Sequence, residues 1–289
     1  MNHYLLSVLL GVIEGVTEFL PVSSTAHLRI AEALLQIDLR DSFWKMYSIV
    51  IQLGAILALP VYFRSRIAEF VSTFPRGARG DRTILTHPLS LTLIAFVVTA
   101  VPSFLLKKQI GLNLESLVVM SWALILGGII MWLVDAIFRA PRIERLDEMS
   151  LPQAIWIGAV QILSAVFPGT SRSMCTIAAG QVAGLSRPAA LEFSFFLSIP
   201  TMVVATGYDL LKTIRPHTHD AADAALAPAA MTGQSWVVLA IGFVVSFIVA
   251  LAVVAWFMRW VRARGFAPFA IYRIGLGALL LVLVARGLV

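Results

Sequence analysis

The sequence predicts an all-α integral membrane protein with six transmembrane helices and two re-entrant helical hairpins, arranged as an inverted-topology repeat. Three observations lead to this prediction. Of the 289 residues, 59% are hydrophobic and 13% are charged, whereas about a quarter of a soluble domain is charged. Six apolar segments are long enough to cross a bilayer. Two further apolar regions are interrupted near the middle by proline and hydroxyl residues.

A helix needs about 20 apolar residues to cross the hydrocarbon core. The segments that meet this length are Ser42–Phe63, His87–Leu106, Ser116–Phe138, Ala189–Lys212, Gly233–Met258 and Ala267–Ala285. The two interrupted regions are Met1–Ile37 and Leu151–Leu185. Neither half of either region is long enough to cross, so each is expected to enter the membrane and return. Pro216–Pro228 is expected to be a polar loop outside the membrane.

The two interrupted regions resemble each other. The segments 11–27 and 158–174 align at a constant separation of 147 residues, about half the chain. The pairs include Gly11 with Gly158, Pro21 with Pro168, and Ser24 with Ser171. Breaking a helix inside an apolar segment exposes backbone groups, which a membrane protein tolerates only where they line a polar cavity. We therefore expect one membrane domain, 1–289, whose repeated halves 1–150 and 151–289 bring two breaks together.

Arginine predicts the topology, because basic residues collect in cytoplasmic loops. Three loops are expected there, and they contain Arg64, Arg66, Arg76, Arg79 and Arg82; Arg139, Arg142 and Arg145; and Arg259, Arg262 and Arg264. With these loops inside, the first hairpin enters from outside and the second from the cytoplasm, so the halves are inverted and the site lies near the midplane. The site then opens to the periplasmic side. The net charge of +6 is explained by these loops, and no nucleic-acid motif is present, so nucleic acid is excluded as a partner.

Carboxylates lie on the helix before the first break. Glu14 and Glu18 are four residues apart and share one helix face. Each charge inside a membrane, including Arg172 after the second break, costs about 3 kcal/mol on insertion scales. One interpretation is a structural ion pair with Arg172. The favoured interpretation is a carboxylate pair that binds a metal or manages a proton.

Hydroxyl residues and a histidine follow the first break. Ser23, Ser24 and Thr25 are suited to cap a helix, and a helix N-terminus also binds anions. Ser24 is a candidate nucleophile if a base lies within reach. His27 is a candidate proton donor or acceptor, against the alternative of a structural histidine.

The second break is richer in positive charge. Arg172 presents a planar fork that suits phosphate oxygens, and Gly169 lets backbone approach a ligand. The predicted phosphate-binding residues are Ser23, Thr25, Gly169, Thr170, Ser171, Arg172, Ser173 and Thr176. Two carboxylates and a diphosphate exceed the available positive charge, so we expect a divalent cation, Mg²⁺ or Ca²⁺, bound by Glu14 and Glu18.

The motifs GVIEGVTEFLPVSSTAHL (11–28), FPGTSRSMCTIAAG (167–180) and EFSFFLSIP (192–200) resemble the bacterial undecaprenyl-diphosphate phosphatase family of the bacitracin-resistance type. The resemblance spans nearly the whole chain. It implies a multi-pass enzyme of the inner membrane that removes the terminal phosphate of undecaprenyl diphosphate, which recycles the lipid carrier for peptidoglycan synthesis. It further implies a divalent cation, a homodimer, and catalytic roles for Glu14, Glu18, His27 and Arg172, with Ser24 as the attacking residue.

The alternative function is a polyprenyl-phosphate transporter or flippase, because inverted repeats with broken helices are typical of secondary transporters. Transport of an anion does not require a carboxylate pair, a histidine and a hydroxyl around an arginine. The residues therefore favour the phosphatase. Whether a phosphoserine forms or water attacks directly is left open by the sequence.

Overall fold

The computed structural model describes residues 2–37, 42–113, 116–214 and 232–287, and the expected loop Pro216–Pro228 lies outside these ranges. Within them the chain is helical, with one short 3-10 turn and no strand. The helices are α1 (His3–Thr17), α2 (Ser24–Leu34), α3 (Ser42–Tyr62), α4 (Arg64–Thr73), α5 (Pro88–Leu105), α6 (Lys107–Asn113), α7 (Leu117–Ile137), α8 (Leu151–Val166), α9 (Arg172–Val182), α10 (Arg187–Ile214), α12 (Gly233–Arg264) and α13 (Ala267–Ala285); the turn is η1 (Leu146–Glu148).

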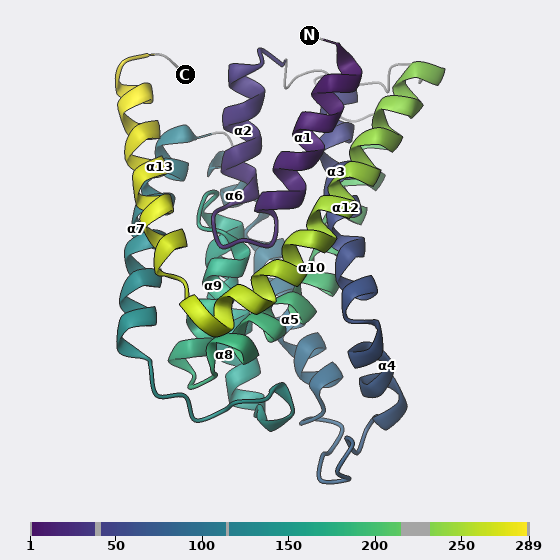
Figure 1. Ribbon diagram of the computed structural model, residues 1–289, viewed down its shortest axis with the longest axis vertical. Coiled ribbons are helices and arrows are strands. Elements are labelled where there is room, and N and C mark those ends of the chain that lie inside the picture. Colours follow the sequence, from purple (N-terminus) through teal and green to yellow (C-terminus); the bar gives the residue numbers. More distant parts are fainter. Residues whose placement is uncertain (1, 38–41, 114–115, 215–231, 288–289) are drawn as a thin grey trace.

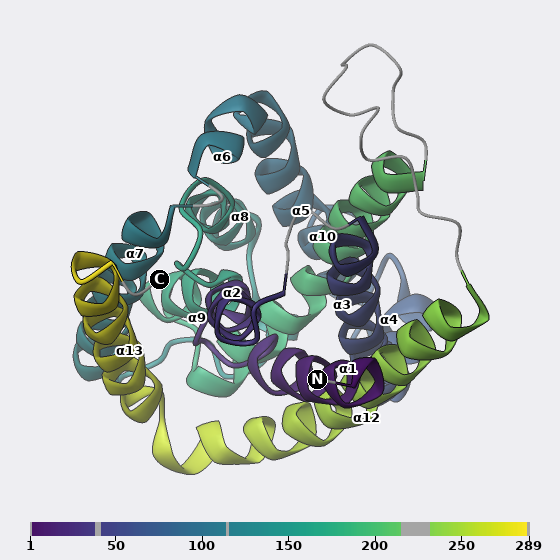
Figure 2. The ribbon, with the colours of Figure 1, turned by 90° about the horizontal axis from the view of Figure 1, so that it is seen from above.

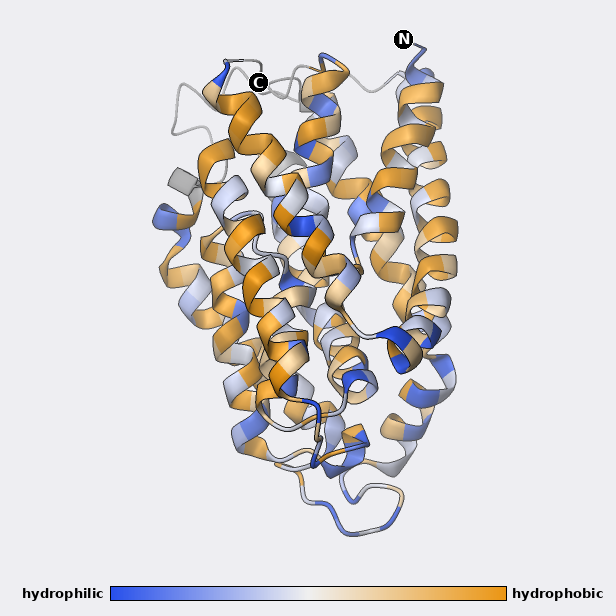
Figure 3. Ribbon diagram, turned by 60° about the vertical axis from the view of Figure 1, so that its left-hand side comes forward, coloured by the Kyte–Doolittle hydropathy of each residue, from blue (hydrophilic) through white to orange (hydrophobic). Residues whose placement is uncertain are grey.

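Five helices are long and apolar enough to cross a membrane, namely α5, α7, α10, α12 and α13. The sixth expected span, Ser42–Phe63, is the first part of a bent pair in which α3 and α4 meet at 65°. Large apolar side chains remain exposed on the outside of the bundle, and Leu105, Ile137 and Ile271 are 76%, 68% and 67% exposed. Figure 3 shows this apolar outer face, with hydrophilic residues concentrated toward the ends. The chain is therefore a multi-pass membrane protein.

Two of the three expected arginine loops are partly helical. Arg64 and Arg66 lie in α4, and Arg259, Arg262 and Arg264 form the last turns of α12, which continues six residues beyond the expected end at Met258. Basic residues stabilise the C-terminal turn of a helix through its dipole. Helix α12 therefore continues through these arginines, although the apolar segment ends at Met258. Arg66 is held by ion pairs to three carboxylates, those of Glu69, Asp147 and Glu192.

Each interrupted region forms two short helices joined by a non-helical turn. Helix α1 packs against α2, and α8 packs against α9. We call residues 18–23 the first break and residues 167–171 the second break. In Figure 1, α1 and α2 occupy the upper half of the molecule with the first break at mid-height, and α8 and α9 lie below. Seen from above, α2 lies over α9 near the middle, and the longer helices enclose both (Figure 2).

Helix contacts in one half are matched in the other. Helix α1 packs on α12 as α8 packs on α5, and α3 packs on α12 as α10 packs on α5. Gly11 and Gly158 make the close approaches: a Cβ on either would collide with a backbone carbonyl, of Gly242 and Ala95 respectively. These two carbonyls are themselves 147 residues apart in the chain. The two glycines that the sequence aligns therefore make their close approaches at positions with the same separation.

Candidate active site

The first break is set by Pro21 and Ser23. Proline cannot donate a backbone hydrogen bond and disfavours helix in the residue before it, so α1 ends at Thr17. Ser23 is the N-cap of α2, and its hydroxyl accepts a hydrogen bond from the Ala26 backbone N–H at 3.4 Å. Its φ of 73° is a left-handed conformation that costs a non-glycine residue about 1–3 kcal/mol. The packing around the break must hold this strained turn.

The second break repeats this geometry. Ser171 is the N-cap of α9 at a φ of 70°, and its hydroxyl accepts from the Met174 backbone N–H at 3.4 Å. Gly169 has a φ of 93°, and a Cβ there would lie 2.6 Å from the Met120 carbonyl oxygen. Only glycine therefore allows the second break to lie against α7.

The two strained N-caps change the expected alignment at one point. The constant separation pairs Ser24 with Ser171, which the structure shows to be wrong: the equivalent N-caps are Ser23 and Ser171. Two residues, Gly169 and Thr170, separate Pro168 from its N-cap Ser171, whereas only Val22 separates Pro21 from Ser23, so the register shifts by one position after the prolines. Ser24 and Arg172 are then equivalent, since they are the first residues of α2 and α9.

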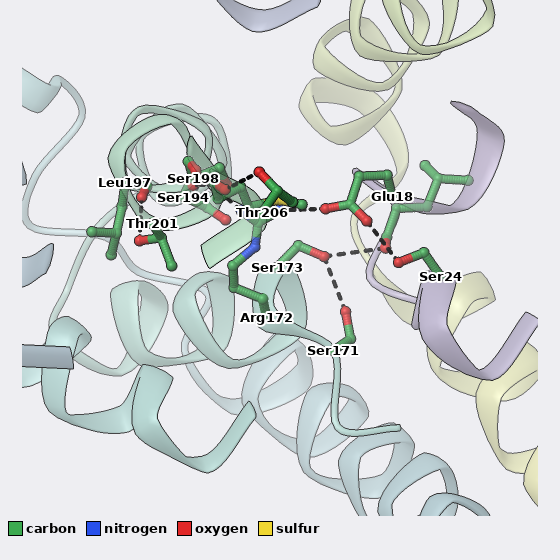
Figure 4. A network of polar contacts seen from close by, with 12 residues as sticks. Glu18, Ser24, Ser171, Arg172, Ser173, Ser194, Leu197, Ser198, Thr201 and Thr206 are labelled. Atoms are coloured by element: carbon green, nitrogen blue, oxygen red, sulfur yellow. Dashed lines mark hydrogen bonds and ion pairs between the residues drawn. The ribbon is translucent and has the colours of Figure 1, made fainter. Parts of the chain in front are cut away.

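Both of these first residues bind the same carboxylate. Arg172 Nη2 donates to Glu18 Oε1 at 3.0 Å, and Ser24 Oγ donates to Glu18 Oε2 at 2.6 Å. Ser173 Oγ donates to the Leu20 carbonyl at 3.1 Å. Figure 4 shows these contacts joining the first break to the start of α9. The structure thus brings Glu18, Ser24 and Arg172 together from the two halves.

The Glu18–Arg172 pair is largely removed from solvent. The side chains are 6% and 14% exposed, and Arg172 Nη1 also donates to the Ser198 carbonyl of α10 at 3.4 Å. The structural ion pair, which was the less favoured interpretation of the sequence, is therefore present for Glu18. Removing one member of a buried ion pair leaves the other charge buried without a partner, which lowers the free energy of unfolding by about 3–5 kcal/mol.

Glu14 takes no part in that ion pair. It is fully buried, and neither of its carboxylate oxygens has a hydrogen-bond partner among the described residues. Its equivalent in the second half, Gln161, is also buried and leaves its Oε1 unpartnered. A buried carboxylate without partners is costly. Binding of a proton or a cation to Glu14 would lower this cost.

Comparison with known proteins places this arrangement in a family. The family model described as bacitracin resistance protein BacA matches residues 7–279. The chain belongs to the BacA family. It is 66% identical to the undecaprenyl-diphosphatase of Koribacter versatilis, with 96% of each chain covered. It is 42% identical to that of Rhizobium etli, with 99% of each covered, and 40% identical to that of Caldanaerobacter subterraneus, covering 97% of this chain and 96% of the relative.

In this BacA-family chain, His27 lies one turn into α2, and its ring nitrogens contact Ser23 and Tyr272 rather than Glu18. Its Nδ1 lies 2.7 Å from the Ser23 carbonyl, so Nδ1–H donates, and its Nε2 lies 2.6 Å from the Tyr272 hydroxyl. The two rings are stacked nearly parallel, with 12° between their planes. Tyr272, from α13, was not found from the sequence, because nothing in the local pattern links two residues so far apart in the chain.

The other predicted phosphate-binding hydroxyls are mostly used within the second break. Ser171 and Ser173 lie 3.1 Å apart, and Thr170 Oγ1 donates to the Phe167 carbonyl at 2.7 Å. Thr176 Oγ1 donates to the Arg172 carbonyl and lies 2.6 Å from Ser194 Oγ. Thr25 is half-buried in the first turn of α2. These contacts shape the BacA-family site, and the predicted contact of these residues with phosphate stays a prediction.

Sequence reasoning also missed Arg273. It lies within the expected span Ala267–Ala285 and is completely buried. Its guanidinium donates to the Pro21 carbonyl of the first break and to the Gly169 and Thr170 carbonyls of the second, at 2.9–3.1 Å. A lone arginine inside an apolar span is costly and marks a functional position, and that signal was available in the sequence.

Proposed function

We propose that this chain is an integral-membrane undecaprenyl-diphosphatase, which hydrolyses undecaprenyl diphosphate to undecaprenyl phosphate and inorganic phosphate. Its BacA-family relatives carry that name at 40–66% identity over nearly the whole chain. The observation that carries the proposal is the contact of Glu18 with both Ser24 and Arg172. A hydroxyl, a base that accepts its proton and an anion-binding guanidinium together suit phosphoryl transfer. The activity recycles the lipid carrier for peptidoglycan synthesis and confers bacitracin resistance.

Ser24 is the attacking residue in this proposal. The Ser24 Oγ forms a bond to the terminal phosphorus while its proton passes to Glu18 Oε2, which lies 2.6 Å away. The bond from the terminal phosphorus to the bridging oxygen breaks, and that oxygen leaves with undecaprenyl phosphate. Water then hydrolyses the phosphoserine and restores the Ser24 hydroxyl. In the direct alternative, Glu18 takes its proton from a water that attacks the phosphorus.

Substrate binding would release Glu18 for this role. Glu18 Oε1 accepts a hydrogen bond from Arg172, which occupies one side of the carboxylate. A diphosphate competes for Arg172, since phosphate oxygens match the same planar fork. We propose that the substrate draws Arg172 from Glu18, so that the carboxylate loses this partner only when a phosphate is in place.

His27 would assist the leaving group or the hydrolytic water. Its Nε2 contacts the Tyr272 hydroxyl, so that role requires the tyrosine to turn aside when the lipid enters. Tyr272 is half-exposed on α13, which leaves it room to do so.

A divalent cation, Mg²⁺ or Ca²⁺, fits Glu14 of α1 together with Glu18 at the start of the first break. Both Glu14 oxygens are buried without partners, and Mg²⁺ is commonly held by one or two carboxylates together with substrate phosphates. Glu14 and Glu18 would hold the ion, with phosphate oxygens completing its coordination, since no group of three or more His, Cys, Asp or Glu side chains suited to a metal occurs in the described ranges. The ion would neutralise charge that develops on the phosphates.

The two hairpins are proposed to be re-entrant, with the breaks near the midplane and the halves in inverted topology. The matched packing of α1 on α12 and α8 on α5 supports this arrangement. The proposed location is the bacterial inner membrane, with the site open to the periplasm and the prenyl chain in the bilayer. A homodimer stays a proposal, tested by mass photometry of the protein in nanodiscs.

Phosphate release from a polyprenyl diphosphate in detergent tests the function, since detergent leaves no two sides to transport between. A diphosphatase releases phosphate, and Glu18→Ala and Arg172→Ala each abolish release while the protein remains folded. A flippase, which the matched halves also suit, releases none. Rapid-quench trapping with labelled substrate separates the two chemical routes, because only the covalent one labels the protein in a Ser24-dependent way.

A further inference from the structure

Arg273 is the buried cation behind the two breaks. It is 0% exposed and among the largest fully buried side chains of the described chain. Helix α7 makes room for it at Gly127, where a Cβ would collide with Arg273 Nη2. A glycine inside a helix lowers the stability of that helix, and a charged residue in an apolar span is costly. The presence of both Gly127 and Arg273 therefore indicates that Arg273 has a role other than packing.

The guanidinium holds both breaks at once. Nη1 donates to the Pro21 carbonyl at 3.1 Å, whereas Nη2 lies 3.1 Å from the Gly169 carbonyl and 2.9 Å from the Thr170 carbonyl. Nη2 also lies 3.1 Å from the Ala123 carbonyl of α7. The planar fork of arginine supplies several donors in fixed directions. One side chain of α13 therefore joins the two breaks.

These carbonyls lie next to the proposed reactive groups along the chain. Pro21 is three residues from both Glu18 and Ser24, and Thr170 is two residues before Arg172. A shift of either break relative to the other would separate Arg172 from Glu18. A displacement of about 1 Å can reduce a rate about 100-fold.

Arg273 also changes the charge of the site. Backbone carbonyls accept its hydrogen bonds but do not neutralise it, and no carboxylate lies within ion-pair distance of it in the described part of the chain. Before any cation is bound, and with Glu14 and Glu18 ionised, Arg172 alone leaves the site negative, whereas Arg172 and Arg273 together balance both carboxylates. A site without that negative excess accepts a diphosphate more readily.

We propose that Arg273 is a positioning residue of the phosphatase site, which holds the two breaks in register and supplies the positive charge that lets the diphosphate bind. This inference rests on the proposed function. Arg273 makes two contributions. Its hydrogen-bond donors determine the relative position of the two breaks, and its charge determines the affinity of the site for an anion.

Two substitutions separate these contributions. Arg273→Lys keeps the charge but has one ammonium, which cannot reach all four carbonyls, and Arg273→Met removes both charge and donors. Arg286→Met is the matched control, because Arg286 follows the same helix and is exposed. Each purified variant is measured for thermal unfolding, for kcat and KM on a polyprenyl diphosphate, and for inhibition by a non-hydrolysable methylene diphosphonate.

We expect Arg273→Lys to lower kcat by at least about 10-fold while the inhibition constant of the diphosphonate stays within about 3-fold of wild type. Arg273→Met is expected to lower kcat by about 100-fold and to raise the inhibition constant by at least about 10-fold. Arg286→Met should match wild type in every measurement. Rates are taken per mole of folded protein, so a loss of folded material does not count as a loss of kcat.

The inference is overturned if the folded fraction of Arg273→Met keeps wild-type kcat and inhibition, which is what a purely structural role predicts. It is also overturned if Arg273→Lys and Arg273→Met weaken the inhibitor equally, because charge then plays no part. If the wild-type protein releases no phosphate, the proposed function is contradicted instead. Phosphate release by the wild-type protein therefore distinguishes a failure of the proposed function from a failure of the inference about Arg273.

Discussion

The ion pair between Glu18 and Arg172 offers the sharpest test of the site, through a double-mutant cycle of Glu18→Gln and Arg172→Met. The two groups are 3.0 Å apart and nearly buried. At an effective dielectric constant of about 20, two unit charges at that separation attract by about 5 kcal/mol before desolvation is subtracted. Each single variant should lose about 3–5 kcal/mol of stability, because one buried charge is left without its partner.

Glu14 determines which of the two single variants loses more stability. Arg172→Met leaves Glu18 beside a second buried carboxylate that has no hydrogen-bond partner, whereas Glu18→Gln leaves Arg172 with the Ser198 carbonyl. Arg172→Met should therefore be the more destabilising. The double variant should lose about 2–3 kcal/mol less than the sum of the singles, since neither charge is then stranded.

The assay is reversible unfolding by SDS titration in mixed micelles, followed by circular dichroism, with phosphate release measured on the same samples. Free energies that add to within about 0.5 kcal/mol would falsify the coupling. An Arg172→Met variant more stable than Glu18→Gln would contradict the account of Glu14. The first result would leave Arg172 as a phosphate ligand only, whereas the second would leave the coupling of Arg172 with Glu18 intact.

Three further predictions concern single positions. Ser24→Ala should lower phosphate release by at least about 1,000-fold with unchanged thermal stability, since it removes the nucleophile; a loss below 10-fold would favour direct attack by water. Gly158→Ala should destabilise the protein by about 1–3 kcal/mol in the SDS titration, because a Cβ collides with the α5 backbone. Gly207→Ala, where a Cβ meets nothing within 4 Å, is the control, and equal losses at both glycines would refute the close-approach argument. Burial lowers the pKa of His87 at the start of α5, with the Arg82 charge acting in the same direction and Asp147 opposing it. The folded state thus favours the neutral ring, so this contribution to stability is complete above the unfolded pKa of about 6.5 and is lost as pH falls below it. The melting temperature should fall between pH 7 and pH 5.5 more in wild type than in His87→Asn, which keeps an N-cap; parallel curves would contradict this.

Much of the fold was predictable because it depends on local pattern. Apolar length predicted the spans, and proline followed by hydroxyls predicted both breaks, since these effects act within a few residues. The pattern was less informative at helix ends: the basic residues expected in the loop after Met258 continue α12 to Arg264. A hydrophobicity pattern reports what faces lipid, and it does not report where a helix leaves the membrane and continues.

The candidate site was predictable in its residues and not in its pairings. The charged and hydroxyl residues stood out because each is costly in an apolar segment. The contact of Glu18 with Arg172, however, joins residues 154 apart in the chain, and no periodicity relates such positions. His27 illustrates the same limit, because its partner Tyr272 is 245 residues away.

By itself the sequence determined that this is a helical membrane protein with two equivalent breaks, and that one break holds carboxylates while the other holds an arginine. Only the tertiary structure decided that Ser23 rather than Ser24 matches Ser171, that Glu14 has no hydrogen-bond partner among the described residues, and that Arg273 joins the two breaks. The physical reason is the distance along the chain over which each interaction acts. Helix length, capping and chain breaks are set by neighbouring residues, whereas the partner of a buried charge is set by which helices pack together.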